Sequence, residues 1–376
     1  MLLKFLIPGL FTLLLITQTH SEESSYPALK IESSVLTITF GQRFGILLIG
    51  LKEESDSKVV TVYPDKEVIE WRLPPNAVLE SVRWLGAEFV ESKRAVGFGS
   101  GPSQARDPIR LASDSFDHVY LVDQAQEKIT KLSRDLLYIT EFGHFSMDTA
   151  GSFEDDFGNF DEGGFDGLKD VLAGDRLSLF VSDSRNHRIV ELDLSGNFVR
   201  EITPPDEFDE PTSLRRNSRN QLYVLDSEKE RILIFNGFGT RQYELGGFGR
   251  DQYHFQRPVD IALNSSDELF VLDAGLKKLR KYSSKSRFIN ETNIEPVYSQ
   301  LHVGPLGFLY ALSDKSKVRC FTPNLVELQR CPLPEGINTL RSLTHLSNKV
   351  LIGLGVQAPY LIQMTPKPSS HSYKIP

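Results

Sequence analysis

Five polar residues occupy one equivalent position in five related segments of the chain, and their side chains are of the types that bind ligands or form ion pairs. Each stands directly before an apolar residue in a short run typical of a β-strand. Because successive side chains of a strand point to opposite faces, these five point away from their packed neighbours. In a closed ring of such strands they would line a central channel. The five residues are Arg110, Asp170, Ser213, Asp260 and Gln300.

The mixed charge of this lining allows two interpretations. The residues bind a polar ligand, or they form internal ion pairs within a hydrated channel, which is the commoner use of such groups. The sequence assigns no catalytic residue and no metal ligand to the set. These five are therefore candidate binding residues only.

A second pair of residue types recurs in the same segments: an aspartate that closes an apolar strand and a basic residue five positions later. We expect each aspartate to accept backbone N–H groups in the tight turn that follows, and each basic residue to reach a neighbouring carboxylate or carbonyl. A feature present in every unit is what the unit needs to fold, so structural roles are predicted. The aspartates are Asp123, Asp183, Asp226 and Asp273, with Ser313 in the fifth segment, and the basic residues are Lys128, Arg188, Arg231 and Lys278.

These closing residues are spaced 60, 43, 47 and 40 residues apart. An aromatic residue lies three positions before each, and the apolar strands are divided by Gly, Asn, Asp and Ser. A period of about 40–50 residues is typical of a four-stranded propeller blade. The sequence therefore predicts an all-β fold, a β-propeller.

The segment DSRNHRIVELDLSGNFV, from Asp183 to Val199, and the segment GGFGRDQYHFQRPVDIAL, from Gly246 to Leu263, closely resemble the NHL repeat. The resemblance covers residues 86–335 well. It implies a six-bladed NHL/TolB-like propeller, since members of this family are commonly six-bladed. It says little about activity, because NHL propellers include binding modules, receptor ectodomains and a few enzymes.

Two enzymes of this fold class offer a comparison. Peptidyl-glycine α-amidating lyase, an NHL-type propeller, holds zinc through histidines from separate blades, and here only His254 and His302 are placed to approach a common channel. A matching set of three zinc-binding histidines cannot be assigned. The metal-binding residues of the gluconolactonase-like propellers are not recognisable either. We therefore predict no metal and no cofactor.

The first 21 residues have the features of a secretory signal peptide: Lys4, an apolar run from Phe5 to Ile16, and small residues before a cut at Glu22. No later stretch is apolar enough to span a membrane. The protein is therefore expected to be exported, to the periplasm, the cell surface or the medium. The two cysteines, Cys320 and Cys331, form a disulfide or remain two buried thiols, because a hairpin near Asn324 would place position 328 opposite Cys320.

Four regions are expected: the signal peptide at 1–21, an N-terminal β extension at 22–85, the propeller at 86–366 and a tail at 367–376. The extension contains five strand-like runs and either packs on the propeller as a subdomain or adds a degenerate seventh blade. We expect the last blade to be composite, with three strands from the C-terminus and an outer strand from Phe89 to Arg94. Its driving force is the removal of open sheet edges at the seam. The five runs are Val35–Phe40, Phe44–Leu51, Lys58–Tyr63, Glu67–Leu73 and Val78–Trp84.

The formal net charge of −8 argues against a nucleic-acid partner. Between two blades lies a long segment rich in Phe, Gly and acids whose spacing does not fit a calcium loop. A loop of this length without a strand period is often functional. We expect Phe153, Phe157 and Phe160 to form a contact surface for a basic or amphipathic protein, whereas Phe165 aligns with Phe255 and is expected to pack.

The sequence as a whole predicts an exported propeller that binds a protein, peptide or glycan, or serves as a scaffold. The alternative is a metal-dependent hydrolase or lyase that uses the channel. The oligomeric state is left open.

Overall fold

The computed structural model describes residues 77–101, 104–143, 164–173, 177–305, 307–328, 331, 333–334, 336–347, 350–356 and 361–373, together with four strands before residue 73. Side chains are described only between residues 91 and 365. Every helix or strand within these ranges is a β-strand, as the sequence predicts. Among the described residues, no helix has the length and apolar character needed to cross a membrane.

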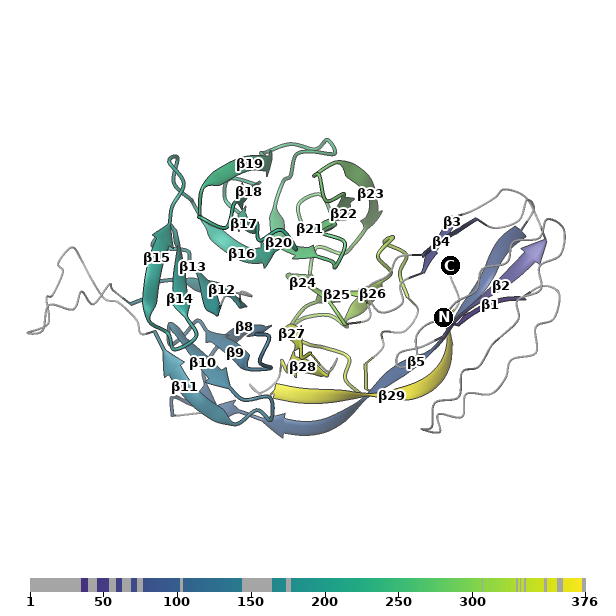
Figure 1. The fold of residues 1–376 in the computed structure, drawn as a ribbon, viewed down its shortest axis with the longest axis horizontal. Helices are drawn as coiled ribbons and strands as arrows, with labels where there is room; N and C mark the ends of the chain where they lie inside the picture. The colour runs from purple at the N-terminus through teal and green to yellow at the C-terminus, as the bar shows by residue number, and fades with distance from the viewer. Residues whose placement is uncertain are drawn as a thin grey trace, which may run out of the picture.

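The first four blades are four-stranded antiparallel sheets arranged around a centre (Figure 1). In each blade the strands follow chain order from the innermost to the outermost. Blade 1 contains β8 (Pro108–Ser113), β9 (Val119–Asp123), β10 (Lys128–Leu132) and β11 (Tyr138–Phe142), and blade 2 contains β12 (Leu168–Ala173), β13 (Ser178–Asp183), β14 (Arg188–Asp193) and β15 (Phe198–Ile202). Blade 3 contains β16 (Pro211–Arg216), β17 (Leu222–Asp226), β18 (Arg231–Phe235) and β19 (Arg241–Gly246), and blade 4 contains β20 (Pro258–Leu263), β21 (Leu269–Asp273), β22 (Lys278–Tyr282) and β23 (Phe288–Asn293).

Blade 5 has three strands, β24 (Gln300–Val303), β25 (Leu309–Leu312) and β26 (Arg319–Phe321). A single bridge from Phe321 to Glu327 stands in place of a fourth strand. Beyond it, a disulfide joins Cys320 to Cys331, with 5.3 Å between their Cα atoms. Leu328 donates its N–H to the carbonyl of Cys320 at 2.7 Å, so position 328 does lie opposite Cys320 and the disulfide is reached three residues later.

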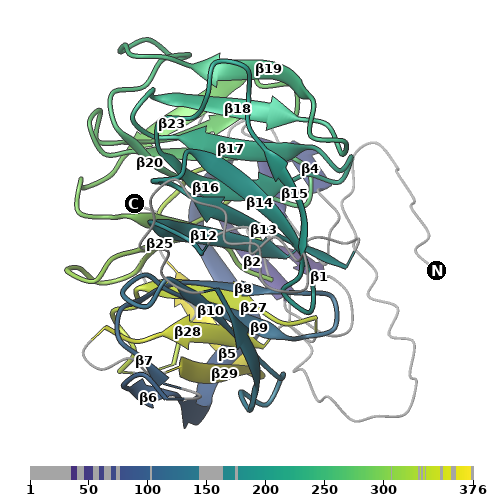
Figure 2. The same cartoon turned by 90° about the vertical axis from the view of Figure 1, so that its left-hand side faces the viewer.

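Blade 6 is composite, which confirms the predicted closure. Its strands β27 (Ser342–His345), β28 (Leu351–Leu354) and β29 (Leu361–Tyr373) come from the C-terminal part, and β5 (Ala77–Ala95) pairs with β29 on the outside. The ring thus has six blades, and the alternative of a seventh is wrong. Figure 2 shows the ring of blades from its edge.

The N-terminal strands extend the sheet of blade 6 away from the ring (Figure 1). β1 (Val35–Thr39) pairs with β2 (Ile46–Glu53), which pairs with the first half of β5, whereas β3 (Val59–Val62) and β4 (Ile69–Arg72) form a separate hairpin. The five strand-like runs expected before residue 85 are all strands. Between β5 and blade 1, β6 (Gly97–Phe98) and β7 (Gln104–Ala105) form a short parallel pair.

The aspartates that close the second strands are fully buried and accept backbone N–H groups, as expected. Most of these N–H groups belong to the segment that leads into the innermost strand, rather than to the following turn. Asp226, for example, accepts the N–H groups of Asp209 and Glu210 at 3.0 and 2.9 Å, and Arg231 adds an ion pair at 3.1 Å. Each aspartate thereby ties the entry of its blade to the second strand.

Apolar side chains fill the spaces between neighbouring blades. Phe165 and Phe255 are both buried, and each ring lies against a glycine at positive φ, Gly143 and Gly246. A Cβ on either glycine would approach the ring within 3 Å, so only glycine fits there. The expectation that Phe165 is a packing residue of the repeat is confirmed.

Candidate functional site

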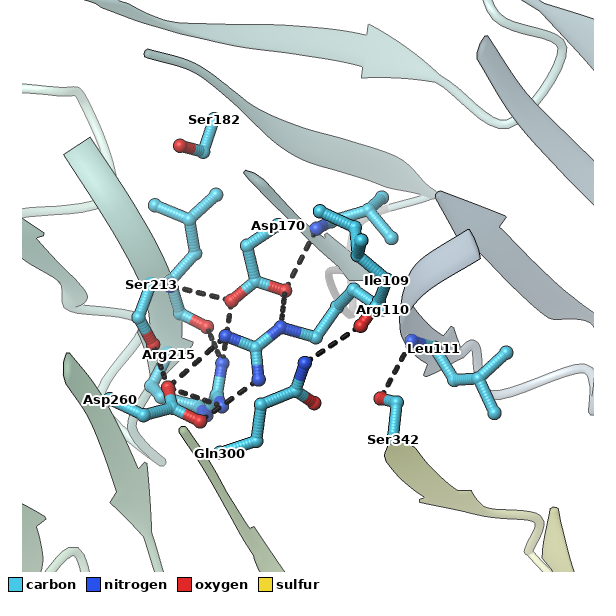
Figure 3. Close-up of polar contacts among 12 residues, drawn as sticks. Ile109, Arg110, Leu111, Asp170, Ser182, Ser213, Arg215, Asp260, Gln300 and Ser342 are labelled. Carbon is cyan, nitrogen blue, oxygen red and sulfur yellow. Dashed lines mark hydrogen bonds and ion pairs between the residues drawn. The ribbon is translucent and has the colours of Figure 1, made fainter. Parts of the chain in front are cut away.

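The five predicted channel residues lie together at the centre of the ring, on the innermost strands of blades 1 to 5 (Figure 3). In β8, β12, β16 and β20 the pairing register shifts beside this position. Such a β-bulge turns a side chain away from the direction that regular pairing would give it. The irregularity therefore helps to build the cluster. We call this cluster the polar layer: Arg110, Asp170, Ser213, Arg215, Asp260, Gln300 and Ser342.

Asp260 is the most connected member of the polar layer and is fully buried. Its Oδ2 accepts the N–H of Leu301 at 2.7 Å and Nη1 of Arg110 at 2.9 Å. Its Oδ1 accepts the Ser213 hydroxyl at 2.5 Å and Nη2 of Arg215 at 3.2 Å. Burial alone would raise the pKa of Asp260, but the charges of Arg110 and Arg215 bring that pKa below its usual value. The side chain is therefore a carboxylate at neutral pH.

Asp170 lies between the same two arginines. Its Oδ2 accepts Nη1 of Arg215 at 2.8 Å, and Nε of Arg110 lies 3.1 Å from its Oδ1. This second contact is within ion-pair distance although the N–H does not point at the oxygen. Burial alone would lower the pKa of Arg110, and the charges of Asp170 and Asp260 raise it instead. Two arginines and two aspartates thus alternate in contact, and their formal charges cancel.

The layer also binds the backbone of neighbouring blades. In blades 2, 4 and 6 the layer residue accepts a backbone N–H from the next blade. The donor is the apolar residue that directly follows the layer position of that blade. These pairs are Asp170 with Leu214 at 2.9 Å, Asp260 with Leu301 at 2.7 Å, and Ser342 with Leu111 at 3.0 Å. The layer therefore joins every second blade to its successor.

In blades 1, 3 and 5 the layer residue donates. Arg110 and Ser213 donate to Asp260, and Nε2 of Gln300 donates to the carbonyl of Ile109 at 2.7 Å. Arg110, Ser213 and Asp260 thus share one network, which Asp170 joins through the two arginines, and Gln300 binds the backbone of blade 1 beside it. Their hydrogen bonds are made within the protein.

Sequence reasoning missed two members of the layer. Arg215 lies two positions after Ser213 and so on the same face of its strand. Ser342 stands directly before Leu343, which is the offset that identified the other five. Strand periodicity could have found Arg215, and Ser342 was missed because the sixth segment lacks the repeated aspartate.

A pair of histidines lies next to the polar layer. Nε2 of His302, on β24, lies 3.1 Å from Nδ1 of His345, at the end of β27. Burial lowers the pKa of His302 well below its usual value, and His345, Arg215 and Arg110 lower it further. Burial also lowers the pKa of His345 to about 4. Both imidazoles are neutral at pH 7, so one ring donates its N–H to the other.

The expectation that His254 and His302 share a channel is wrong. His254 lies on the exposed loop before β20, and its Nδ1 is 2.8 Å from the carboxylate of Asp251. The channel neighbour of His302 is His345. Within the described ranges, no group of three or more His, Cys, Asp and Glu side chains is arranged to hold a metal ion.

The loop residues Phe153, Phe157 and Phe160 lie outside the described residues. Their expected role as a contact surface stays a prediction.

The comparisons with known proteins agree with this architecture. A family model described as a 6-bladed beta-propeller matches residues 207–330. No curated protein matches the chain.

Three solved structures resemble the chain at low identity. A streptogramin B lyase shares 13% identity with a TM-score of 0.48, over 74% of this chain and 98% of that one. A catalytically inactive virginiamycin B lyase from Staphylococcus aureus with quinupristin shares 14% identity with a TM-score of 0.49, over 90% of this chain and 97% of that one. The selenomethionine-substituted virginiamycin B lyase from Staphylococcus aureus shares 13% identity with a TM-score of 0.47, over 87% of this chain and 93% of that one. Likeness at this level carries no argument about activity.

Proposed function

We propose that the protein is an exported propeller of the NHL/TolB type that binds a protein, peptide or glycan or acts as a scaffold for it. In this proposal residues 1–21 are a signal peptide, 22–85 an extension, 86–366 the propeller and 367–376 a tail. The disulfide between Cys320 and Cys331 supports export, because disulfides persist in oxidising compartments.

The single observation that carries the binding role is the closure of the polar layer. Its arginines and aspartates neutralise one another, and Asp170 and Asp260 also accept backbone N–H groups of the next blades. The charges that suggest a ligand site are therefore used to hold the blades together. The loops and outer faces of the blades remain for recognition, as is usual for a rigid scaffold.

Within this proposal, Phe153, Phe157 and Phe160 contribute to the contact surface, and the partner is a basic or amphipathic protein. The test is a pull-down from the exported fraction of the native host with residues 152–162 replaced by a short Gly/Ser linker. A matched control is Phe116→Ser, which removes an aromatic residue with 59% exposure from a different loop. Partner loss with the linker variant alone, at unchanged melting temperature, is expected. Retention of every partner by the folded linker variant would refute the role of the loop.

A metal-dependent hydrolase or lyase that uses the channel is the second candidate. The observation in its favour is the neutral pair of His302 and His345 beside Arg215. Neutral imidazoles are the form that binds transition metals or accepts a proton. Stoichiometric metal analysis of the purified protein decides between the two functions. One tightly held ion per chain, lost in His302→Ala and His345→Ala, would favour the enzyme.

A further inference from the structure

The strands of blades 1 to 4 run antiparallel in chain order, so two turns of each blade lie at the same end: the turn from the first to the second strand and the turn from the third to the fourth. Because the blades repeat around the ring, these turns together form one of its two faces (Figure 2). We call this face the turn face. The segments that lead from one blade to the next lie at the opposite face.

Large apolar side chains protrude from the turn face of blades 1 to 3. Phe238, between β18 and β19, is 82% exposed, which is the largest value among the large apolar side chains that the structure describes. Phe116 and Leu137 in blade 1 and Leu177 in blade 2 are each more than half exposed. Side chains this exposed add little to the packing of the blades, so their apolar surface is available to a partner.

The turn that carries Phe238 is held in place by hydrogen bonds. Oδ1 of Asn236 accepts the N–H groups of Phe238 and Thr240, each at 3.0 Å. From the neighbouring blade, Arg200 donates to the carbonyls of Gly237 and Phe238 at 3.2 and 2.5 Å. The backbone of this tip is therefore fixed before anything binds, which lowers the entropy cost of binding.

The exposed charges of blades 3 and 4 on the turn face are basic. Arg219 lies in the inner turn of blade 3, and its Nη2 donates to the carbonyl of Ser284 at 3.0 Å. This contact joins it to the outer turn of blade 4, which carries Lys285 and Arg287. The side chains of Arg219, Lys285 and Arg287 are all exposed. We call these three residues the basic patch.

The acidic side chains beside the basic patch are engaged within the protein. Asp267 is buried and accepts the N–H and the hydroxyl of Ser218 at 2.8 and 2.6 Å. Glu268 pairs with Lys281 at 2.9 Å. The patch is therefore basic although the chain has a formal net charge of −8. Among the described turns of this face, the exposed acid is Asp135 in blade 1, and Arg134 stands beside it.

The opposite face has a different distribution of charge. Its exposed residues carry both signs in similar number. Exposed basic charge that is not balanced by exposed acids is therefore a feature of the turn face. Examples from the opposite face are Asp206, Glu207 and Asp209 with Arg185 and Lys277.

Isolated apolar tips beside basic residues fit a lipid surface better than a protein surface. The core of a protein interface is a contiguous apolar patch from which charged residues are depleted. Here the tips are spread over three blades. A bilayer needs no contiguous patch, because each apolar side chain enters the boundary of headgroups and acyl chains separately, and Lys and Arg bind anionic headgroups. The tips are Phe and Leu, which have no polar group to bind a sugar hydroxyl.

We propose that the turn face docks on an anionic lipid surface, with Phe238 inserted among the lipids and the basic patch against the headgroups. β11 ends and β12 begins at the opposite face, so the segment that joins them starts and ends away from the lipid. Docking therefore leaves the opposite face open to a protein partner. The proposal does not depend on that partner.

The test is co-sedimentation of the full 376-residue chain with vesicles of phosphatidylcholine that contain about 30% phosphatidylglycerol, at low salt. Binding is expected there and not to phosphatidylcholine alone. Phe238→Ser is expected to weaken binding by about tenfold or more at unchanged melting temperature. Lys285→Gln combined with Arg287→Gln is expected to weaken it about fivefold for each charge removed. Phe248→Ser, which removes a side chain with 71% exposure from the opposite face, is the matched control and is expected to bind as the wild type does.

A fluorescence measurement separates docking by the turn face from binding through another part of the chain, such as the apolar run near the N-terminus. Phe238→Trp is expected to be quenched by brominated acyl chains more than the native tryptophans of the wild type. Phe248→Trp is expected to show no added quenching.

Three results would overturn the proposal. The first is a wild-type protein that does not bind the anionic vesicles, which would leave an acidic protein as the partner of the basic patch. The second is a folded Phe238→Ser variant that binds as tightly as the wild type. The third is a Phe238→Trp variant without added quenching.

Discussion

The polar layer makes a quantitative prediction about the pair formed by Arg110 and Asp260. Asp260→Asn keeps the shape of the side chain but leaves two arginines facing one aspartate in a buried site. Breaking a buried pair by removing one partner costs about 3–5 kcal/mol. Arg110→Met leaves the opposite excess, two aspartates with one arginine, and its cost is expected to be of the same order. Each single change is then a large part of the ~5–15 kcal/mol that stabilises an ordinary domain.

The double variant restores the balance, since Asp170 and Arg215 remain as one pair at 2.8 Å. We therefore expect the double variant to lose less stability than the sum of the two single variants, by about 2 kcal/mol. Urea denaturation at pH 7 measures all three free energies of unfolding. Ser213→Ala removes only a neutral donor to Asp260 and is the control, with an expected cost of about 1 kcal/mol. Additivity of the single variants within about 0.5 kcal/mol would refute the charge-balance reasoning.

Three further predictions concern other parts of the ring. Since the pKa of His345 falls from 6.5 to about 4 on folding, its contribution to stability is complete above pH 6.5 and is lost as the pH falls to 4. His345→Gln is expected to remove about 3 kcal/mol from that pH dependence. The free energy of unfolding is measured by urea denaturation between pH 4 and 7, and the same change with pH in the wild type and the variant would contradict this. Asp226→Ala is expected to cost about 1–3 kcal/mol and lower the melting temperature without loss of binding, because it leaves two backbone donors unpaired; lost binding at unchanged stability would overturn the structural role. Replacing Cys320 and Cys331 by alanine is expected to cost about 2–3 kcal/mol, as the loop they close is short, and an unchanged melting temperature would show that the cross-link contributes nothing.

Much of the fold could be predicted because short sequence patterns specify each blade. The repeated aspartates, the aromatic residues three positions before them and the strand period mark each blade locally. Even the composite last blade followed from one physical requirement, the removal of open edges at the seam. What local patterns do not specify is register, and β5 continues to pair with β29 well beyond the short outer strand expected at residues 89–94.

The candidate site was predictable only in part for the same reason. Strand periodicity placed Arg110 and Asp260 on the channel side of their strands, but their contact joins residues 150 positions apart in the sequence. No short sequence pattern indicates which arginine contacts which aspartate. The histidine pair was missed because His345 lies in the segment without the repeated aspartate, so that His302 was matched with His254 instead.

The hydrogen-bond pattern of the polar layer also shows how the layer connects the blades. Donors occupy blades 1, 3 and 5 as Arg110, Ser213 and Gln300, and acceptors occupy blades 2, 4 and 6 as aspartate, aspartate and serine. The donors do not serve neighbouring acceptors in turn, because Arg110 of blade 1 reaches Asp260 of blade 4 and Gln300 of blade 5 reaches the backbone of blade 1. The polar layer therefore connects blades across the ring as well as around it.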